Sequence, residues 1–330
     1  MVRFMTYGIG QTSLVKSTRI AKEIGLKELY LKLEGENPTG THKDRLAIQH
    51  VDDAIIRGYD TISVGSCGNY GVAMSFVACK SNLACRVYLP RKYSGEMIET
   101  IKGYGAQAIL VEGSYEDAVI ESRRQAENNG WYDANPGTKN TPTALVAYVD
   151  ISEEILEDLG ETPSTVSIPM GNGTTLAGVH LGFRLLWHKK RATSIPRMIG
   201  VSSQGNNSIT HSFSNGLHDM EDLEPGDLNE TEVNEPLLNW HAYDGQEALN
   251  AIYDTHGMAV GLTDREMLHY NELLKEEGIS SLPASASALG GLKRFIVENG
   301  IEGKHVVLLT SGVKNVRNNG KDTGTGFCRR

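Results

Sequence analysis

The sequence has few features that would place it in a membrane or at a metal centre. No apolar run approaches the roughly 18 residues that a membrane helix needs, and the first residues lack the apolar core of a signal peptide. Only four residues are cysteines, and none forms a Cys-x-x-Cys pair or joins a histidine cluster with zinc-ligand spacing. We therefore expect a cytoplasmic protein with no metal site and no membrane partner.

The net charge argues against two further classes of partner, and the chain length indicates the number of domains. A net charge of −9 opposes non-specific binding to nucleic acid or to anionic membranes. The one basic run, residues 189–191, is short and typical of a helix end. A chain of 330 residues, 39% of them hydrophobic, is too long for one core, so we expect two domains.

Short β-rich runs alternate with helical patterns along the chain. This order predicts an α/β fold with parallel sheets, helices on both faces and a ligand at the carboxyl ends of strands. Strands are expected at residues 61–64, 86–89, 108–111, 165–169, 198–201 and 305–309. Helices are expected at residues 44–57, 71–79, 96–104, 115–128, 143–159, 175–187, 245–254, 264–276 and 285–297. The polar residues 202–238 are expected to form a surface excursion, either a plain loop or a lid or oligomer contact.

Lys43 stands where a strand, a turn and a helix start meet. Apolar residues alternate up to Leu33, turn residues follow at 37–40, and Thr41 is a candidate helix cap. A lysine in the first turn of a helix at a cleft would have a lowered pKa, because the helix dipole and partial burial disfavour the ammonium ion. Such an amine can form an imine and transfer protons, whereas most lysines are solvated surface charges.

Two loops of small residues have the form of anion sites, although each could be an ordinary strand–helix turn. Residues 63–71 run from a strand into a helix and would expose backbone N–H groups at the helix start. Residues 167–178 repeat this pattern, with glycines that allow close approach of a phosphate and threonines that add hydroxyls. No Gly-Lys-Ser/Thr follows, and no acid after the next strand would bind a ribose, so a single phosphomonoester is favoured over a dinucleotide.

Together and in this order, these motifs resemble the fold type II enzymes that use pyridoxal 5′-phosphate, over nearly the whole chain. Residues 37–45 resemble the lysine motif of these enzymes, closest to the threonine synthase form with Lys-Asp-Arg. Residues 10–14 resemble their opening Gly-x-Thr-Pro-Leu, with Ser13 in place of the proline. Residues 263–266 and 282–288 are similar to a capped helix and a small-residue helix late in threonine synthases.

The resemblance implies a role for each matched residue. Lys43 would be the catalytic lysine that forms a Schiff base with the cofactor. Asn69 would meet the cofactor's 3′-oxygen, and Thr310 its pyridine nitrogen, with Ser311 as the alternative register. The phosphate would lie against Gly171, Asn172, Gly173, Thr174 and Thr175. The substrate would meet Ser66, Cys67, Gly68 and His42. Cys67 could also be a nucleophile, and His42 could either relay protons or pack beside the phosphate.

The architecture implied by the resemblance is α/β, with two three-layer αβα domains of mostly parallel twisted sheets and an active-site cleft between them. Residues 1–45 and 146–330 would form the larger, cofactor-binding domain, and residues 46–145 a smaller, mobile domain. A homodimer acting on a small amino acid substrate is expected.

The implied activity is that of a threonine-synthase-like lyase, which eliminates phosphate from O-phosphohomoserine and adds water to give threonine. Arg45, Arg91 and Lys92 are candidates to bind the substrate's phosphate. One departure is His42, where threonine synthases and dehydratases usually carry phenylalanine; a His-Lys pair is more similar to tryptophan synthase β-subunits, whose other motifs are absent. A β-replacement or serine/threonine dehydratase enzyme, and a catalytically silent protein that binds the cofactor, are the alternatives.

Overall fold

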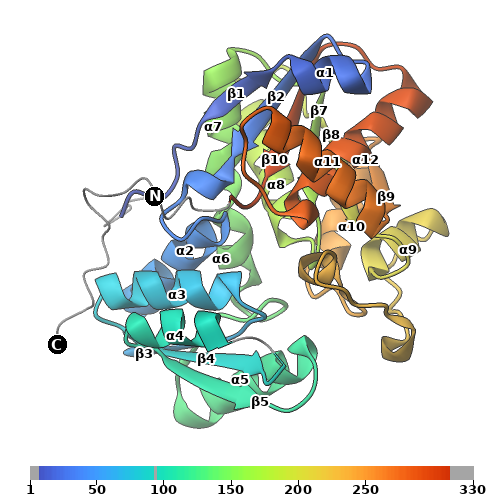
Figure 1. Ribbon diagram of the computed structural model, residues 1–330. Helices are drawn as coiled ribbons and strands as arrows, with labels where there is room; N and C mark the ends of the chain where they lie inside the picture. The colour runs from blue at the N-terminus through green and yellow to red at the C-terminus, as the bar shows by residue number, and fades with distance from the viewer. Residues whose placement is uncertain (1–6, 93–94, 313–330) are drawn as a thin grey trace. The chain divides into compact units, whose positions relative to one another are not determined.

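The computed structural model describes residues 7–92 and 95–312, which form two compact units (Figure 1). The smaller unit comprises residues 37–147 with residues 7–9, and the larger unit comprises residues 10–36 and 148–312. The sequence-based division placed residues 37–45 in the larger domain. The structure groups them with the smaller unit, because the helix that begins at Lys43 packs on other helices of that unit.

The smaller unit is built on a parallel sheet with the strand order β5-β4-β3-β6. Its strands are β3 (Thr61–Gly65), β4 (Ala84–Pro90), β5 (Gln107–Val111) and β6 (Tyr132–Asp133). Its helices are α2 (Lys43–Ile56), α3 (Asn69–Lys80), α4 (Gly95–Gly103), α5 (Tyr115–Asn129) and α6 (Thr141–Val146). Every residue of β3 is buried, as expected for a central parallel strand that helices cover on both faces.

The larger unit is built on a six-stranded sheet with the order β1-β2-β10-β7-β8-β9, in which only the β1–β2 pair is antiparallel. Its strands are β1 (Leu14–Ser17), β2 (Glu28–Leu33), β7 (Thr165–Pro169), β8 (Arg197–Ser203), β9 (Met258–Leu262) and β10 (Lys304–Leu309). Its α-helices are α1 (Arg19–Ile24), α7 (Val149–Leu159), α8 (Thr174–His188), α9 (Ser208–Ser214), α10 (Gly245–Asp254), α11 (Asp264–Glu276) and α12 (Pro283–Asn299). Short 3₁₀ turns are η1 (Glu34–Glu36), η2 (Pro225–Asp227) and η3 (Glu235–Leu237).

The main apolar core of the larger unit lies between the sheet and helices α1, α11 and α12. Helix α8 contacts β7 and β8 and packs against α7 and α10. All five residues of β7 are buried, which fits a strand with helices on both of its faces. The predicted α/β fold with mostly parallel sheets is therefore confirmed.

Two sequence-based expectations need correction. The helix predicted for residues 143–159 is two helices, α6 and α7, which are separated at Ala147 and Tyr148, where the chain passes from one unit to the other. The excursion at residues 202–238 is not wholly on the surface, since it contains α9 and the fully buried Asn207. Strands β1, β6 and β9 lie at sheet edges, and helices α1 and α9 are short; sequence patterning did not predict these five elements.

Gly65, the last residue of β3, lies directly against the backbone of α5. A Cβ added at this position would come within 2.6 Å of the Val119 Cα. We expect Gly65→Ala to lower the free energy of unfolding by about 1–3 kcal/mol, the usual cost of overpacking, as measured by urea denaturation. Gly226→Ala is the matched control, because a Cβ there has nothing within 4 Å. Equal losses for the two variants would contradict this packing.

Candidate active site

Lys43, the predicted catalytic residue, is the first residue of α2, and His42 is the N-cap residue. The predicted cap is therefore displaced by one position, although the Thr41 hydroxyl still accepts a hydrogen bond from the Lys43 amide at 3.2 Å. The Lys43 side chain is half-buried, and its Nζ lies 6.0 Å from the centre of the Tyr70 ring. The sequence thus located the helix start on which the lysine lies.

Ser66 shapes the loop between β3 and α3. Its Oγ accepts hydrogen bonds from the amides of Gly68 and Gly71 at 2.9 and 2.8 Å. Because a hydroxyl has two acceptor positions and one proton, Ser66 can still donate that proton to a ligand. Gly68 is the N-cap of α3, and a Cβ on it would come within 2.3 Å of Met97 Cε, so no larger residue fits there unless Met97 moves. Cys67 is half-buried and is not part of a disulfide.

Tyr70 links this loop to Lys43, and sequence reasoning did not single it out. It follows Asn69, which is the exposed first residue of α3. Its hydroxyl donates to the Ala134 carbonyl at 2.9 Å, which fixes the ring beside Lys43. The smaller unit therefore brings together the starts of α2 and α3. The residues predicted in the lysine motif and in the loop at 63–71 lie at these two starts.

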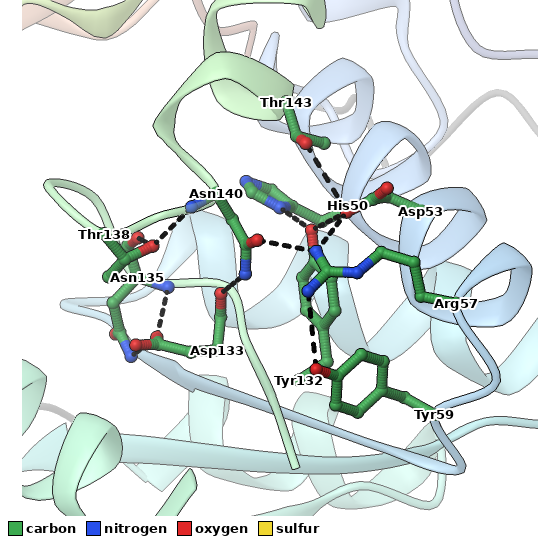
Figure 2. Close-up of polar contacts among 10 residues, drawn as sticks. All are labelled: His50, Asp53, Arg57, Tyr59, Tyr132, Asp133, Asn135, Thr138, Asn140 and Thr143. Atoms are coloured by element: carbon green, nitrogen blue, oxygen red, sulfur yellow. Dashed lines mark hydrogen bonds and ion pairs between the residues drawn. The ribbon is translucent and has the colours of Figure 1, made fainter. Parts of the chain in front are cut away.

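A partly buried hydrogen-bond network holds α2 in place within the smaller unit (Figure 2). The Tyr132 hydroxyl donates to Asp53 Oδ2 at 2.6 Å and lies 3.1 Å from His50 Nδ1. Since the single tyrosine proton goes to Asp53, His50 Nδ1 must carry the proton of the second bond. Burial lowers the pKa of His50 to about 4, so this histidine is neutral at physiological pH.

Arg57, the C-cap residue of α2, extends the network toward α6. Its Nη1 donates to Asp53 Oδ2 at 3.1 Å and to Asn140 Oδ1 at 2.8 Å (Figure 2). Asn140 Nδ2 in turn donates to the Asp133 carbonyl at 2.7 Å. These bonds attach α2 to β6 and to the start of α6, and they constrain the rotation of the helix that carries Lys43.

In the larger unit, the predicted phosphate loop is the turn between β7 and α8. Gly173 is the N-cap of α8 with φ = 87°, a left-handed conformation that favours glycine. No side chain of the described residues caps this helix, and its first turn contains no acid. Because the first amides of a helix have no acceptor within the helix, the start of α8 presents N–H donors and the positive end of its dipole to the turn.

One residue of the excursion and two residues just after it hold this turn. Asn207 Nδ2 donates to the Gly171 carbonyl at 3.0 Å. Asn172 Oδ1 accepts from Asn239 Nδ2 at 3.1 Å and from the Tyr243 amide at 3.2 Å. The Asn172 carbonyl oxygen therefore has a structural role. Sequence reasoning missed these partners, because they lie 36 to 71 residues from the turn and no local pattern marks them.

Thr310 follows β10 and is 8% exposed. Strands β10 and β7 are parallel neighbours, with Val307 opposite Ser167, so Thr310 leaves the same edge of the sheet as the turn at Gly171. Ser311, the alternative in that register, has structural partners: its amide lies 3.4 Å from Ser285 Oγ, and its carbonyl accepts from Ser281 at 3.2 Å. The larger unit thus places the predicted phosphate loop and Thr310 at the ends of adjacent strands.

The chemistry of the turn at Gly171 suits a phosphate. The uncapped amides at the start of α8 and the hydroxyl groups of its threonines are types of hydrogen-bond donor, and a phosphate oxygen is an acceptor. The glycines allow a phosphate to come close to the backbone. By contrast, α5 and α11 begin with complete capping boxes, at Ser114 and Thr263, which satisfy their own first amides.

The family model of the pyridoxal-phosphate dependent enzymes matches residues 5–312. This chain belongs to that family. Its cofactor is pyridoxal 5′-phosphate, which confirms the resemblance drawn from the motifs and fits the donors of the turn. The described residues contain no cluster of side chains that could hold a metal ion. Within the same residues, every helix is too short or too polar to cross a bilayer.

Individual proteins are similar to this chain over most of its length. The threonine synthase of Methanocaldococcus jannaschii is 30% identical over 307 residues, which cover 92% of this enzyme and 74% of that protein. The structure of L-serine ammonia-lyase from Rhizomucor miehei aligns with a TM-score of 0.77 and 20% identity, over 92% of this chain and 94% of that one. Maize serine racemase aligns with a TM-score of 0.75 and 20% identity, over 93% and 91%. At such identities the two structures establish a shared fold alone.

The buried His50 should make this pyridoxal-phosphate enzyme sensitive to acid. Its pKa in the folded protein, about 4, is below the ordinary 6.5, so the unfolded chain binds its proton first. Stability is therefore full above pH 6.5 and falls as the pH drops toward 4, by on the order of 3 kcal/mol from this residue. His50→Asn, which keeps a donor near Tyr132, should make the urea midpoint of unfolding less dependent on pH across this pH range.

Other buried histidines leave part of the acid sensitivity in the His50→Asn variant. Burial also lowers the pKa of His180 to about 4, so His180→Asn serves as the comparison and should flatten the profile separately. A His50→Asn profile parallel to that of the native protein at every pH would contradict the assignment of a neutral His50.

Proposed function

We propose that this enzyme is a threonine-synthase-like lyase, which eliminates phosphate from O-phosphohomoserine and adds water to give threonine. The observation that supports this most directly is the 30% identity to a threonine synthase over 92% of the chain. The Lys-Asp-Arg at residues 43–45 adds to it, since it is the threonine synthase form of the lysine motif.

We assign Lys43 to hold the cofactor and to move the proton at the substrate Cα. Its place in the first turn of α2 supports this role, because the positive end of the helix dipole opposes an ammonium charge there. Asn69 and Thr310 are assigned to the ring substituents, and the turn from Gly171 to Thr175 to the phosphate. When bound, the cofactor supplies an electron sink for the charge left on Cα. Thr310 is neutral and cannot hold a positive charge at the pyridine nitrogen as a carboxylate would, which favours elimination over transamination.

The start of α3 is proposed to bind the substrate carboxylate. The available proton of Ser66 is a suitable donor for that carboxylate, together with amides of this loop other than those of Gly68 and Gly71, which already donate to Ser66 Oγ. His42 is proposed to meet the substrate beside Lys43. For the substrate's phosphate, Arg45 is completely buried, so Arg91 and Lys92, which are both exposed, remain the candidates. The Arg91 guanidinium is paired with Glu112.

Further expectations from the family belong to the same proposal. We propose a homodimer in the cytoplasm, with a smaller domain that moves when substrate binds. For the domain boundary we adopt residue 37 rather than residue 46, because α2 packs with α3 and α6.

Turnover with defined substrates tests the proposed activity. Purified holoenzyme should convert O-phosphohomoserine to threonine with one phosphate released per threonine, measured by phosphate assay and amino acid analysis. Keto acid formed from serine or threonine without phosphate release would instead identify a dehydratase. Bound cofactor with no turnover of any of these amino acids would identify a catalytically silent protein.

Replacing the assigned lysine tests its role. Lys43→Ala should lower kcat/KM for O-phosphohomoserine by about 10³-fold or more, a loss typical of removing a catalytic base. Lys102→Ala, on the exposed face of α4 and paired with Glu99, is the control and should retain the native value. A Lys43→Ala enzyme that keeps native kcat/KM would refute the assignment.

A further inference from the structure

Thr174 and Thr175 are adjacent at the start of α8, but their hydroxyls have different partners. The Thr174 hydroxyl donates to Asp244 Oδ2 at 2.5 Å, and the two side chains are 6% and 0% exposed. The Thr175 hydroxyl makes no hydrogen bond to any other residue that the structure describes. Only one of these two threonines is therefore tied to the protein through its side chain.

The number of protons on a hydroxyl makes this difference chemically important. A threonine hydroxyl has one proton to donate, and phosphate oxygens are acceptors. The Thr174 proton is already given to a buried carboxylate, so it cannot also be given to a ligand. The Thr175 proton remains available for one.

Asp244 lies where it can hold the Thr174 hydroxyl in this way. It is the N-cap residue of α10, so its carboxylate lies at the positive end of that helix's dipole, which lowers the cost of a negative charge close to an anion site. Its backbone also borders the turn: a Cβ on Gly173 would come within 3.0 Å of the Asp244 carbonyl oxygen and 2.7 Å of Ala248 Cβ. The turn and the start of α10 are thus packed against each other.

We propose that Asp244 is a positioning residue of the phosphate loop. It turns the Thr174 hydroxyl away from the ligand and leaves Thr175 as the residue whose hydroxyl meets the cofactor phosphate. Thr174 contributes through its backbone amide. This inference rests on the proposed role of the turn from Gly171 to Thr175, and it separates two threonines that the sequence motif treats alike.

Titration of the apoprotein with pyridoxal 5′-phosphate tests the division of roles. Thr175→Val should raise the Kd about ten- to a hundredfold, the scale of a lost hydrogen bond to a charged group, whereas Thr174→Val should raise it by less than about threefold. Pyridoxal, which lacks the phosphate, is the control ligand. It should bind Thr175→Val and the native protein equally.

The melting temperature of the apoprotein provides a second readout that needs no ligand. Thr174→Val removes the donor to a buried carboxylate and should lower the melting temperature, whereas Thr175→Val should leave it unchanged. Thr174→Ser keeps the hydroxyl and should restore native stability. In the Asp244→Asn background, Thr174→Val should cost less than in the native protein, because the pair is already altered.

Two results would overturn the proposal. If Thr174→Val weakens pyridoxal 5′-phosphate binding as much as Thr175→Val does, both hydroxyls reach the phosphate and Asp244 does not divide them. If the native protein binds pyridoxal as tightly as pyridoxal 5′-phosphate, the turn is not a phosphate site and the proposed function of the loop fails as well. In that second case the stability coupling of Thr174 to Asp244 would persist, which distinguishes the two failures.

Discussion

Helix α8 begins without a side-chain cap, and this constraint governs the chemistry of the larger unit. A helix start has amides that need acceptors, and the turn from Gly171 to Thr175 meets this need with neither an acid nor a capping hydroxyl. The turn is instead braced from outside by Asn207, Asn239 and Asp244. Its shape is therefore set by the protein itself, and we propose that the cofactor phosphate accepts from the amides that the chain leaves open.

The smaller unit applies the same principle to the starts of α2 and α3. The N-cap residues His42 and Gly68 make no side-chain cap, and one hydroxyl, of Thr41 or of Ser66, accepts from a first-turn amide of each helix. Tyr70 places the two starts side by side. The direction of α2 is fixed by partly buried polar bonds two to three turns further along the helix, at His50 and Asp53. The bonds that position α2 therefore do not involve the first turn, which contains Lys43.

Local patterns predicted the starts of α2, α3 and α8 to within about two residues. The positions of Lys43 and Gly173 at helix starts were predicted from glycines, turn residues and neighbouring apolar runs. This was possible because the signals for a strand–turn–helix unit lie in consecutive residues. The partners of these loops could not be predicted in this way. Asp244 lies 70 residues from Thr174, and Tyr132 lies 82 from His50, so only the folded chain brings them together. The break between α6 and α7 was missed for a similar reason, since it depends on the passage between units rather than on local propensity.

The proposed chemistry depends on Lys43 as the residue that carries pyridoxal 5′-phosphate. The most direct measurement is borohydride reduction of the holoenzyme, followed by proteolysis and mass spectrometry of the peptides. We expect a reduced cofactor adduct on the peptide that contains Lys43. An adduct on another lysine, such as the fully buried Lys32, or cofactor that is released intact after reduction, would contradict it.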